Sequence, residues 1–453
     1  MPFTSAFMRS RGISTKISRA VLRAAPRLVL VAALAVFCWM VNRSALARGE
    51  QGGTHWVGIW TTPPMAQPAV QQAPAATVPE GPRPAGAPAP TPPVPPIGFN
   101  NQTLRIIART TMAGHQVRVR LSNAYGTIPL AIGAAHIALR TEGAGIRPDT
   151  DRTLTFGGAK STKIWTGAME VSDPVNLDVP ALTDLAVSIY LPGDVPASFP
   201  ITFHRLARQT NYISPAGDFS ASLEMPVSTT RDSWYFLSGI DVMAPDHVGG
   251  LVAFGDSLTD ANISTPNTNS RWPDELASRL VAAHQAVGVM NEGTGGDRIL
   301  HDGVAGSNDS GLHRFDRDVL SQPGVTQVIV FLGINDIRNR NPQEAVTADE
   351  MIAGYQQLIL RAHARGIKIY GATLLPNENE SAYTPEGEAK REAVNNWIRT
   401  SSAFDAVIDF EKVLRDPNDP TSMLTKYDCG DHLHPNDLGY KTLGDAIDLA
   451  LLK

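Results

Sequence analysis

The sequence predicts an α/β protein in which a parallel sheet follows an antiparallel, sandwich-like β domain. Two observations carry this prediction. Between residues 99 and 245, short alternating or β-branched runs are separated by Gly, Pro, Asn and Asp, which is typical of antiparallel sandwiches. From Gly249 onward, apolar runs alternate with helical stretches, which favours a parallel sheet with helices on both faces. A chain of 453 residues also exceeds one ordinary core, so two domains are expected.

The first 47 residues differ in composition from the rest of the chain. Six basic residues and no acidic residue precede the apolar segment 28–41, and "SALA" ends at Ala47. This pattern predicts a secretory signal peptide, because the apolar segment is shorter than the ~20 residues of a membrane span. The expected location is therefore periplasmic or extracellular, with no stable membrane anchor after cleavage. Retention as an uncleaved anchor is the alternative.

Residues 48–245 are expected to form an accessory β-rich domain. "HWVGIWTT" predicts its first strand, and the run 63–96, dominated by Pro and Ala, predicts an extended loop or tether. Between residues 99 and 245 the histidines are scattered, and each is expected to be a packed or surface residue instead of a ligand; they are His115, His136 and His204. The further strands are expected at 102–110, 115–124, 185–192 and 201–207.

Residues 246–453 are expected to form a second domain. Helical stretches follow the apolar runs in regular alternation, so the strands should be parallel. The expected strands are 250–257, 325–333, 366–376 and 404–410, with a further short strand before a glycine-rich stretch. The expected helices are 272–284, 348–366, 384–401 and 437–452.

Composition excludes several functions. The formal net charge is -5 without a concentrated basic stretch after the first thirty residues, which argues against a nucleic-acid partner. Two cysteines, Cys38 and Cys429, cannot form a disulfide framework. Neither a phosphate-binding P-loop nor a usable dinucleotide-binding glycine motif is present.

Four stretches of the second domain place polar residues where strands end. Ser257 follows the first strand, and the others are "MNEGTGGDRIL" (290–300), "FLGINDI" (331–337) and "CGDHLHPND" (429–437). In a parallel sheet, ligands bind in the crevice beyond the carboxyl ends of the strands. We therefore expect these stretches to meet there.

The residue types in these stretches suit acyl transfer. A serine hydroxyl needs a base to take its proton, and that base needs an orienting group. Asp431 precedes His434 by three residues, so its carboxylate can reach one ring nitrogen and leave the other for Ser257. An oxyanion also needs donors, and the N–H groups of Ser257 and Gly296 and the side-chain amide of Asn335 are the candidates.

Together the four stretches resemble the SGNH, or GDSL, hydrolase superfamily. "GDSLTD", "NEGTGGD", "GIND" and "DHLH" match its four blocks in order. The resemblance implies Ser257 as nucleophile, Asp431 and His434 as the rest of a triad, and Gly296 and Asn335 as oxyanion donors. It also implies a flavodoxin-like three-layer domain that works without a cofactor. The N-terminal part resembles a bacterial esterase subgroup in which a β domain precedes the hydrolase.

The expected function is that of an exported serine ester hydrolase acting through an acyl-enzyme. Polar segments flank the blocks at 261–272 and 301–315, which predicts a shallow cleft suited to short acyl esters of carbohydrates or small alcohols. One alternative is a lysophospholipase or thioesterase of the same superfamily. Another is a carbohydrate-binding protein with a non-functional hydrolase domain. A third is a metal-dependent hydrolase, whose candidate ligands are Asp428, Asp431, His432 and His434.

Overall fold

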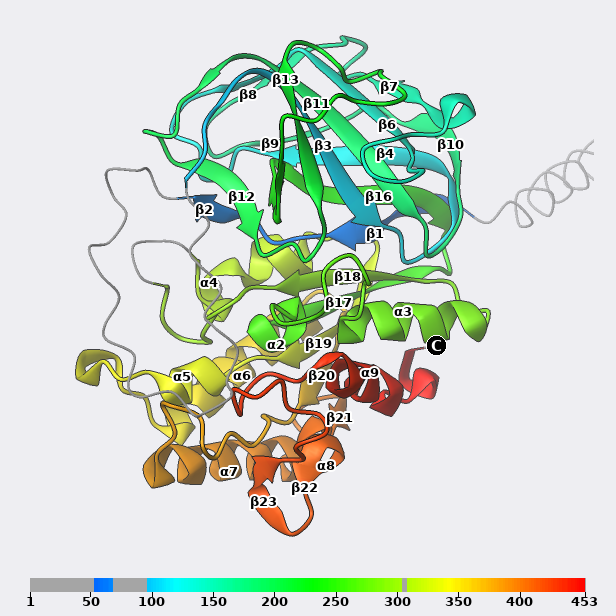
Figure 1. Cartoon of the computed structure of the whole chain (residues 1–453). Coiled ribbons are helices and arrows are strands. Elements are labelled where there is room, and N and C mark those ends of the chain that lie inside the picture. Colours follow the sequence, from blue (N-terminus) through cyan, green and yellow to red (C-terminus); the bar gives the residue numbers. More distant parts are fainter. Residues whose placement is uncertain (1–52, 68–95, 304–307, 453) are drawn as a thin grey trace, which may run out of the picture. The chain divides into compact units, whose positions relative to one another are not determined.

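Five parallel strands form the central sheet of the C-terminal half of the chain (Figure 1). The computed structural model describes residues 53–67, 96–303 and 308–452. The order of strands is β18-β17-β19-β20-β21, so the first strand in sequence lies between the second and the third, as in flavodoxin-like sheets. The strands are β17 (Gly249–Gly255), β18 (Val287–Gly293), β19 (Val325–Phe331), β20 (Lys368–Ala372) and β21 (Ala406–Ile408).

Helices cover both faces of this sheet. Successive side chains of a strand point to opposite faces, and accordingly Leu251 and Ala253 belong to one buried cluster while Val252 and Phe254 belong to another. The first cluster includes side chains of α3 (Trp272–Ala282), α8 (Phe410–Leu414) and α9 (Asp437–Ala446). The second includes side chains of α4 (Gly311–Phe315), α6 (Ala348–His363) and α7 (Pro385–Thr400). The predicted parallel sheet between two helical layers is confirmed.

Local signals explain where several helices begin. Thr347 and Glu350 form a capping box at the start of α6, and Thr384 caps α7 with a proline at its first position. The prediction for the last helix was too long. The helix α9 ends at Ala446, and a separate 3₁₀ turn follows at Leu449–Leu452.

The N-terminal half consists of antiparallel sheets, as the sequence predicted. "HWVGIWTT" forms β1, the edge of the first sheet. That sheet contains β1 (Thr54–Thr61), β16 (Leu237–Pro245), β4 (Gly114–Ser122), β10 (Val175–Val179) and β9 (Met169–Val171). The second contains β14 (Thr229–Arg231), β13 (Asn211–Ala216), β3 (Phe99–Arg109), β11 (Asp184–Val195), β6 (Ala134–Leu139) and β7 (Arg152–Leu154). Smaller sheets are β15 (Ser233–Tyr235), β12 (Ile201–Arg205) and β2 (Met65–Gln67); β5 (Leu130–Ile132) and β8 (Thr162–Ile164); and, in the C-terminal half, β22 (Arg415–Asp416) and β23 (Asp419–Met423).

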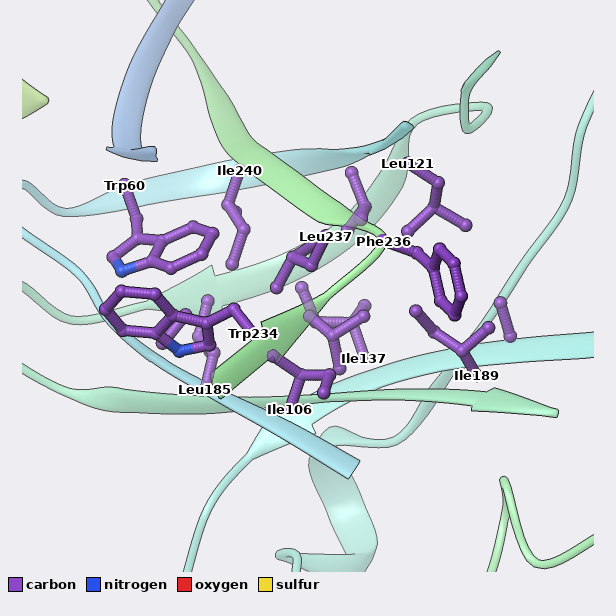
Figure 2. Packing of buried hydrophobic residues seen from close by; sticks show 14 of the residues in the cluster. Trp60, Ile106, Leu121, Ile137, Leu185, Ile189, Trp234, Phe236, Leu237 and Ile240 are labelled. Atoms are coloured by element: carbon purple, nitrogen blue, oxygen red, sulfur yellow. The ribbon is translucent and has the colours of Figure 1, made fainter. Parts of the chain in front are cut away.

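One buried cluster contains side chains from both large antiparallel sheets (Figure 2). Ile240 comes from the first sheet, and Ile106 and Leu185 come from the second. Trp60 and Trp234 meet edge to face in this cluster, with ring centroids 5.1 Å apart. The finer description of this region as a sandwich stays a prediction.

Residues of the N-terminal half lie against β18, the edge strand of the parallel sheet. The hydroxyl of Thr111 accepts a hydrogen bond from the N–H of Val289 in β18 at 3.0 Å and donates to the carbonyl of Ile59 at 2.7 Å. A side chain on Gly288 would overlap the carbonyl oxygen of Gly58, so the two backbones approach closely. Strand edges expose unpaired N–H and C=O groups, and this contact satisfies part of that edge.

The predictions for the N-terminus lie outside the described residues. These are the signal peptide over residues 1–47 and most of the proline-rich run, of which only residues 63–67 and 96 are described. Residues 54–453 form one unit by their contacts, so the predicted boundary at 245/246 stays a prediction. Among the helices that the structure describes, none has both the length and the apolarity to cross a bilayer.

Candidate active site

Ser257 is the first residue of the short helix α2 (Ser257–Asp260), directly after β17. Asp256 caps this helix, because its Oδ1 accepts a hydrogen bond from the N–H of Leu258 at 2.9 Å. Asp256 therefore fixes the turn that follows β17. Gly255 permits the turn, since a side chain there would overlap the carbonyl of Phe331 and the hydroxyl of Thr259. Ser257 is only 6% exposed.

Asp431 and His434 lie in the loop before α9 and reach Ser257. The Nδ1 atom of His434 is 2.7 Å from Oδ2 of Asp431, and its Nε2 atom is 2.8 Å from Oγ of Ser257. The other carboxylate oxygen of Asp431 accepts hydrogen bonds from the N–H groups of Leu433 and His434. Burial raises the pKa of Asp431, but the bonds from His434 and these N–H groups outweigh burial and hold it well below its usual range.

The glycine-rich stretch lies against the turn that carries Ser257. The N–H of Thr294 donates to the carbonyl of Gly255 at 3.0 Å. Gly296 has a φ of +81°, which favours glycine, and a Cβ built on it would meet nothing within 4 Å. Its backbone conformation, and not a lack of space, therefore requires glycine at this position.

The sequence predicted that Asn335 lies at the end of a strand. In the structure it lies instead in the first turn of α5 (Ile334–Arg338). The strand β19 already ends at Phe331. The Nδ2 atom of Asn335 donates to the carbonyl of Asp297 at 3.0 Å, and its Oδ1 accepts from Arg338 at 3.0 Å. Glu380 in turn holds Arg338 through two hydrogen bonds of 2.7 and 3.0 Å. The bond to Asp297, the residue after Gly296, ties Asn335 to the glycine-rich stretch.

Buried carboxyl groups and one arginine hold the turn at Ser257 and the glycine-rich stretch in place. Burial raises the pKa of Asp256 and of Asp297 to about 7, and that of Asp336 to about 6. Asp297 pairs with the buried Arg314 at 2.7 Å, and Arg314 also donates to the carbonyl of Gly255. Asp336 accepts hydrogen bonds from two backbone N–H groups of the segment after Asp297. Asp336 therefore has a structural role in this loop.

The candidate metal ligands do not form the set that the sequence suggested. Among the described residues, Asp428, Cys429 and Asp431 place one ligand atom each within 4.8 Å of one another. Asp431 already binds His434, and the ring of His432 instead lies 2.8 Å from Asp428. This donor set is a poor fit for a metal.

Sequence reasoning did not identify Arg314 or Arg338. No motif marks either residue, and each also binds partners that are distant along the chain. Arg338 pairs with Glu380, 42 positions later, and Arg314 reaches Gly255, 59 positions earlier. Only the three-dimensional arrangement brings out these roles.

Comparison with known proteins finds one family. The GDSL-like Lipase/Acylhydrolase family matches residues 253–442. Among solved structures, the chain is similar to a carbohydrate acetylesterase family member from Sinorhizobium meliloti, with 18% identity over 45% of this chain and 97% of the other, and a TM-score of 0.37. A GDSL-like lipase from Bacteroides thetaiotaomicron VPI-5482 has 18% identity over 45% and 87% of the two chains, with a TM-score of 0.34.

A third solved structure, an acetyl xylan esterase, has 20% identity over 44% of this chain and 96% of the other, with a TM-score of 0.34. No curated protein matches the chain. The family match spans Ser257, Gly296, Asn335, Asp431 and His434. The chain therefore contains, over residues 253–442, a domain of the GDSL-like lipase/acylhydrolase family, preceded by antiparallel β structure.

Proposed function

We propose that this protein is a serine ester hydrolase in which Ser257 is the nucleophile, His434 the general base and Asp431 the residue that orients the base. The hydrogen-bonded series from Asp431 through His434 to Ser257, with contacts of 2.7 and 2.8 Å, carries the proposal. A base within hydrogen-bond reach of the nucleophile, itself held by a third group, is the arrangement that activates a serine hydroxyl. No cofactor takes part.

The reaction proceeds in two halves. Nε2 of His434 takes the proton of Ser257 while Oγ bonds to the ester carbonyl carbon. The tetrahedral intermediate collapses, the bond to the alcohol oxygen breaks, and His434 gives its proton to the leaving alcohol. A water molecule then attacks the acyl-enzyme by the same route and releases the acid. Asp431 favours the tautomer of His434 that carries its proton on Nδ1. Nε2 is then unprotonated and can act as the base.

The developing oxyanion is proposed to bind the N–H groups of Ser257 and Gly296 and the side chain of Asn335. An amide nitrogen carries two hydrogens, and the carbonyl of Asp297 takes one of those on Asn335. The other is available to the oxyanion. Arg338 binds Oδ1, which fixes which end of the amide faces the substrate.

The proposed substrates are short-chain acyl esters, either of carbohydrates or of small aryl and alkyl alcohols. The flanking segment 261–272 is polar, and its residues include several exposed ones. A tunnel for a long acyl chain needs an apolar lining, because each buried CH₂ contributes ~0.8 kcal/mol. The basic and apolar composition of residues 1–47 supports export to the periplasm or beyond. A nucleic-acid partner is not expected.

A panel of p-nitrophenyl esters from acetate to palmitate tests the proposal, with wild type and Ser257→Ala side by side. Acetate and butyrate should be cleaved fastest, and the rate should fall beyond about eight carbons. Ser257→Ala should lower turnover on the order of 10⁶-fold at an unchanged melting temperature. Residual turnover above a tenth of wild type would exclude Ser257 as nucleophile. A kcat/KM that rises steadily to palmitate would instead favour a lipase or lysophospholipase.

A further inference from the structure

Two side chains bind the carbonyl oxygen of Gly295, and one of them comes from the N-terminal half. Nη2 of Arg205, the last residue of β12, donates to this oxygen at 2.9 Å across 90 positions of sequence. Nδ2 of Asn308 donates to the same oxygen at 3.1 Å. A side chain on Gly295 would lie 3.2 Å from Nη2 of Arg205 and would overlap the amide of Asn262. The absence of a Cβ is what permits this approach.

The carbonyl of Gly295 and the N–H of Gly296 belong to one peptide unit. A peptide bond is planar and trans, so its C=O and N–H point in opposite directions. Donors that fix the oxygen therefore also fix the direction of the N–H. The space beside Gly296 is open on the side where a Cβ would stand. The N–H of Gly296 is one of the proposed oxyanion donors, so the inference about this peptide rests on the proposed function.

We infer that Arg205 is a positioning residue of the esterase site, which orients and polarises the Gly295–Gly296 peptide so that its N–H binds the oxyanion. Hydrogen bonds from charged donors are roughly twice as strong as neutral ones. A donor on the carbonyl of an amide also strengthens the N–H of the same amide as a donor. The polarised N–H binds the acyl oxygen more strongly as this oxygen gains negative charge. It therefore stabilises the transition state more than it stabilises the bound substrate.

The surroundings of Arg205 favour this role. Its Nε atom is buried without a hydrogen-bond partner among the described residues, so the guanidinium makes few alternative contacts. The negative charge of Asp260, in the helix that Ser257 begins, attracts the guanidinium. Asp260 also pairs at 3.1 Å with His204, the residue before Arg205, and both side chains are buried. The end of β12 is therefore joined to α2 and to the glycine-rich stretch at once.

Arg208 provides a matched control. It lies three residues further on, and its Nε donates to the carbonyl of Ser264 at 2.6 Å. It therefore also joins the N-terminal half to a loop of the hydrolase domain. The contacts of Arg208 do not include the Gly295–Gly296 peptide. Loss of a generic contact between the two halves should affect both arginine variants alike.

The test compares Arg205→Met, Arg205→Lys and Arg208→Met on p-nitrophenyl acetate in the full-length protein. Arg205→Met should lower kcat by about 10- to 100-fold, less than the loss of a direct oxyanion donor, with KM within about threefold. The inhibition constant of phenylboronic acid, which forms a tetrahedral adduct on an active serine, should weaken by a similar factor. Arg205→Lys should recover part of kcat, because lysine keeps a charged donor. Arg208→Met should keep kcat within about threefold.

The inference is overturned if Arg205→Met keeps kcat within about twofold of wild type, or if Arg208→Met loses as much as Arg205→Met. If Arg205→Met does not fold, Arg205→Gln replaces it, because glutamine keeps an N–H donor but no charge, and an unchanged kcat in that variant would equally overturn the inference. Ser257→Ala separates the two proposals. An active Ser257→Ala contradicts the proposed function itself, whereas an inactive Ser257→Ala with a fully active Arg205→Met contradicts only the role of Arg205.

Discussion

Nε2 of His434 lies 2.8 Å from Oγ of Ser257, although 177 positions separate the two residues in sequence. The contact joins the loop before the last helix to the turn after the first strand of the parallel sheet. The ring is held from its other side by Asp431 at 2.7 Å. The ring of His434 is therefore held between Asp431 and Ser257.

Asp431→Asn should lower kcat on the order of 10³- to 10⁴-fold. Asparagine has nearly the same shape, but its amide can donate to Nδ1 and so favours the tautomer whose Nε2 carries the proton. That tautomer cannot accept the proton of Ser257. Steady-state kinetics with the melting temperature as control would check this. A variant with more than a tenth of wild-type kcat would show that Asp431 is not the orienting group.

Asn335→Ala should lower kcat by roughly 10²- to 10³-fold with little change in KM, as expected for a lost oxyanion donor. Arg338 binds Oδ1 of Asn335, so Arg338→Met should have a weaker effect in the same direction. Kinetics over a range of substrate concentrations separates kcat from KM. A change confined to KM in Asn335→Ala would mean that this side chain binds the ground state of the substrate.

Chelation by EDTA should leave the rate of ester hydrolysis unchanged, because Asp431 binds His434 and Asp428 binds the ring of His432. The assay compares untreated protein with protein dialysed against the chelator. Activity that disappears on dialysis and returns with zinc or manganese would support the metal-dependent alternative, whose candidate ligands are Asp428, Asp431, His432 and His434.

Asp256→Asn should flatten the dependence of folding stability on pH. Burial raises the pKa of Asp256 from 3.8 to about 7, so between these values the folded state holds a proton that the unfolded state has lost. The contribution of this bound proton to the free energy of unfolding is fully present below about pH 4 and is lost as pH rises to about 7. It amounts to at most about 4 kcal/mol, at 1.36 kcal/mol per pKa unit.

Asparagine at position 256 keeps the oxygen that accepts from Leu258 but cannot titrate. The free energy of unfolding of Asp256→Asn and of wild type is measured by urea denaturation at pH 4.5 and pH 8. It should fall less between these pH values in the variant than in wild type. Equal falls in the two proteins would show that Asp256 is ionised throughout the interval.

Much of the parallel domain could be predicted from the sequence because its signals are local. Apolar runs such as 325–333 report strands buried on both faces, and the four blocks stand directly after strands or before the last helix. The scattered histidines were expected to be packed or surface residues, and His204 is buried. The hydrogen bond between Asp431 and His434 was expected from a spacing of three residues.

The remaining features depend on contacts that no local pattern contains. Hydrophobic periodicity tells which face of a strand is buried but not what covers it. The pairing of His204 with Asp260, and the hydrogen bond from Arg205 to Gly295, join segments 56 and 90 positions apart. The end of α9 at Ala446 was also missed, since the apolar residues continue beyond it in a 3₁₀ turn.

The contact of Thr111 and Gly58 with β18 has a consequence for dissecting the protein. A fragment that begins at residue 246 would lose the hydroxyl that binds the N–H of Val289 and the backbone that lies against Gly288. The outer strand of its sheet would then be free to recruit a strand from another molecule. Expressed alone, the C-terminal half should therefore self-associate more readily than the full chain.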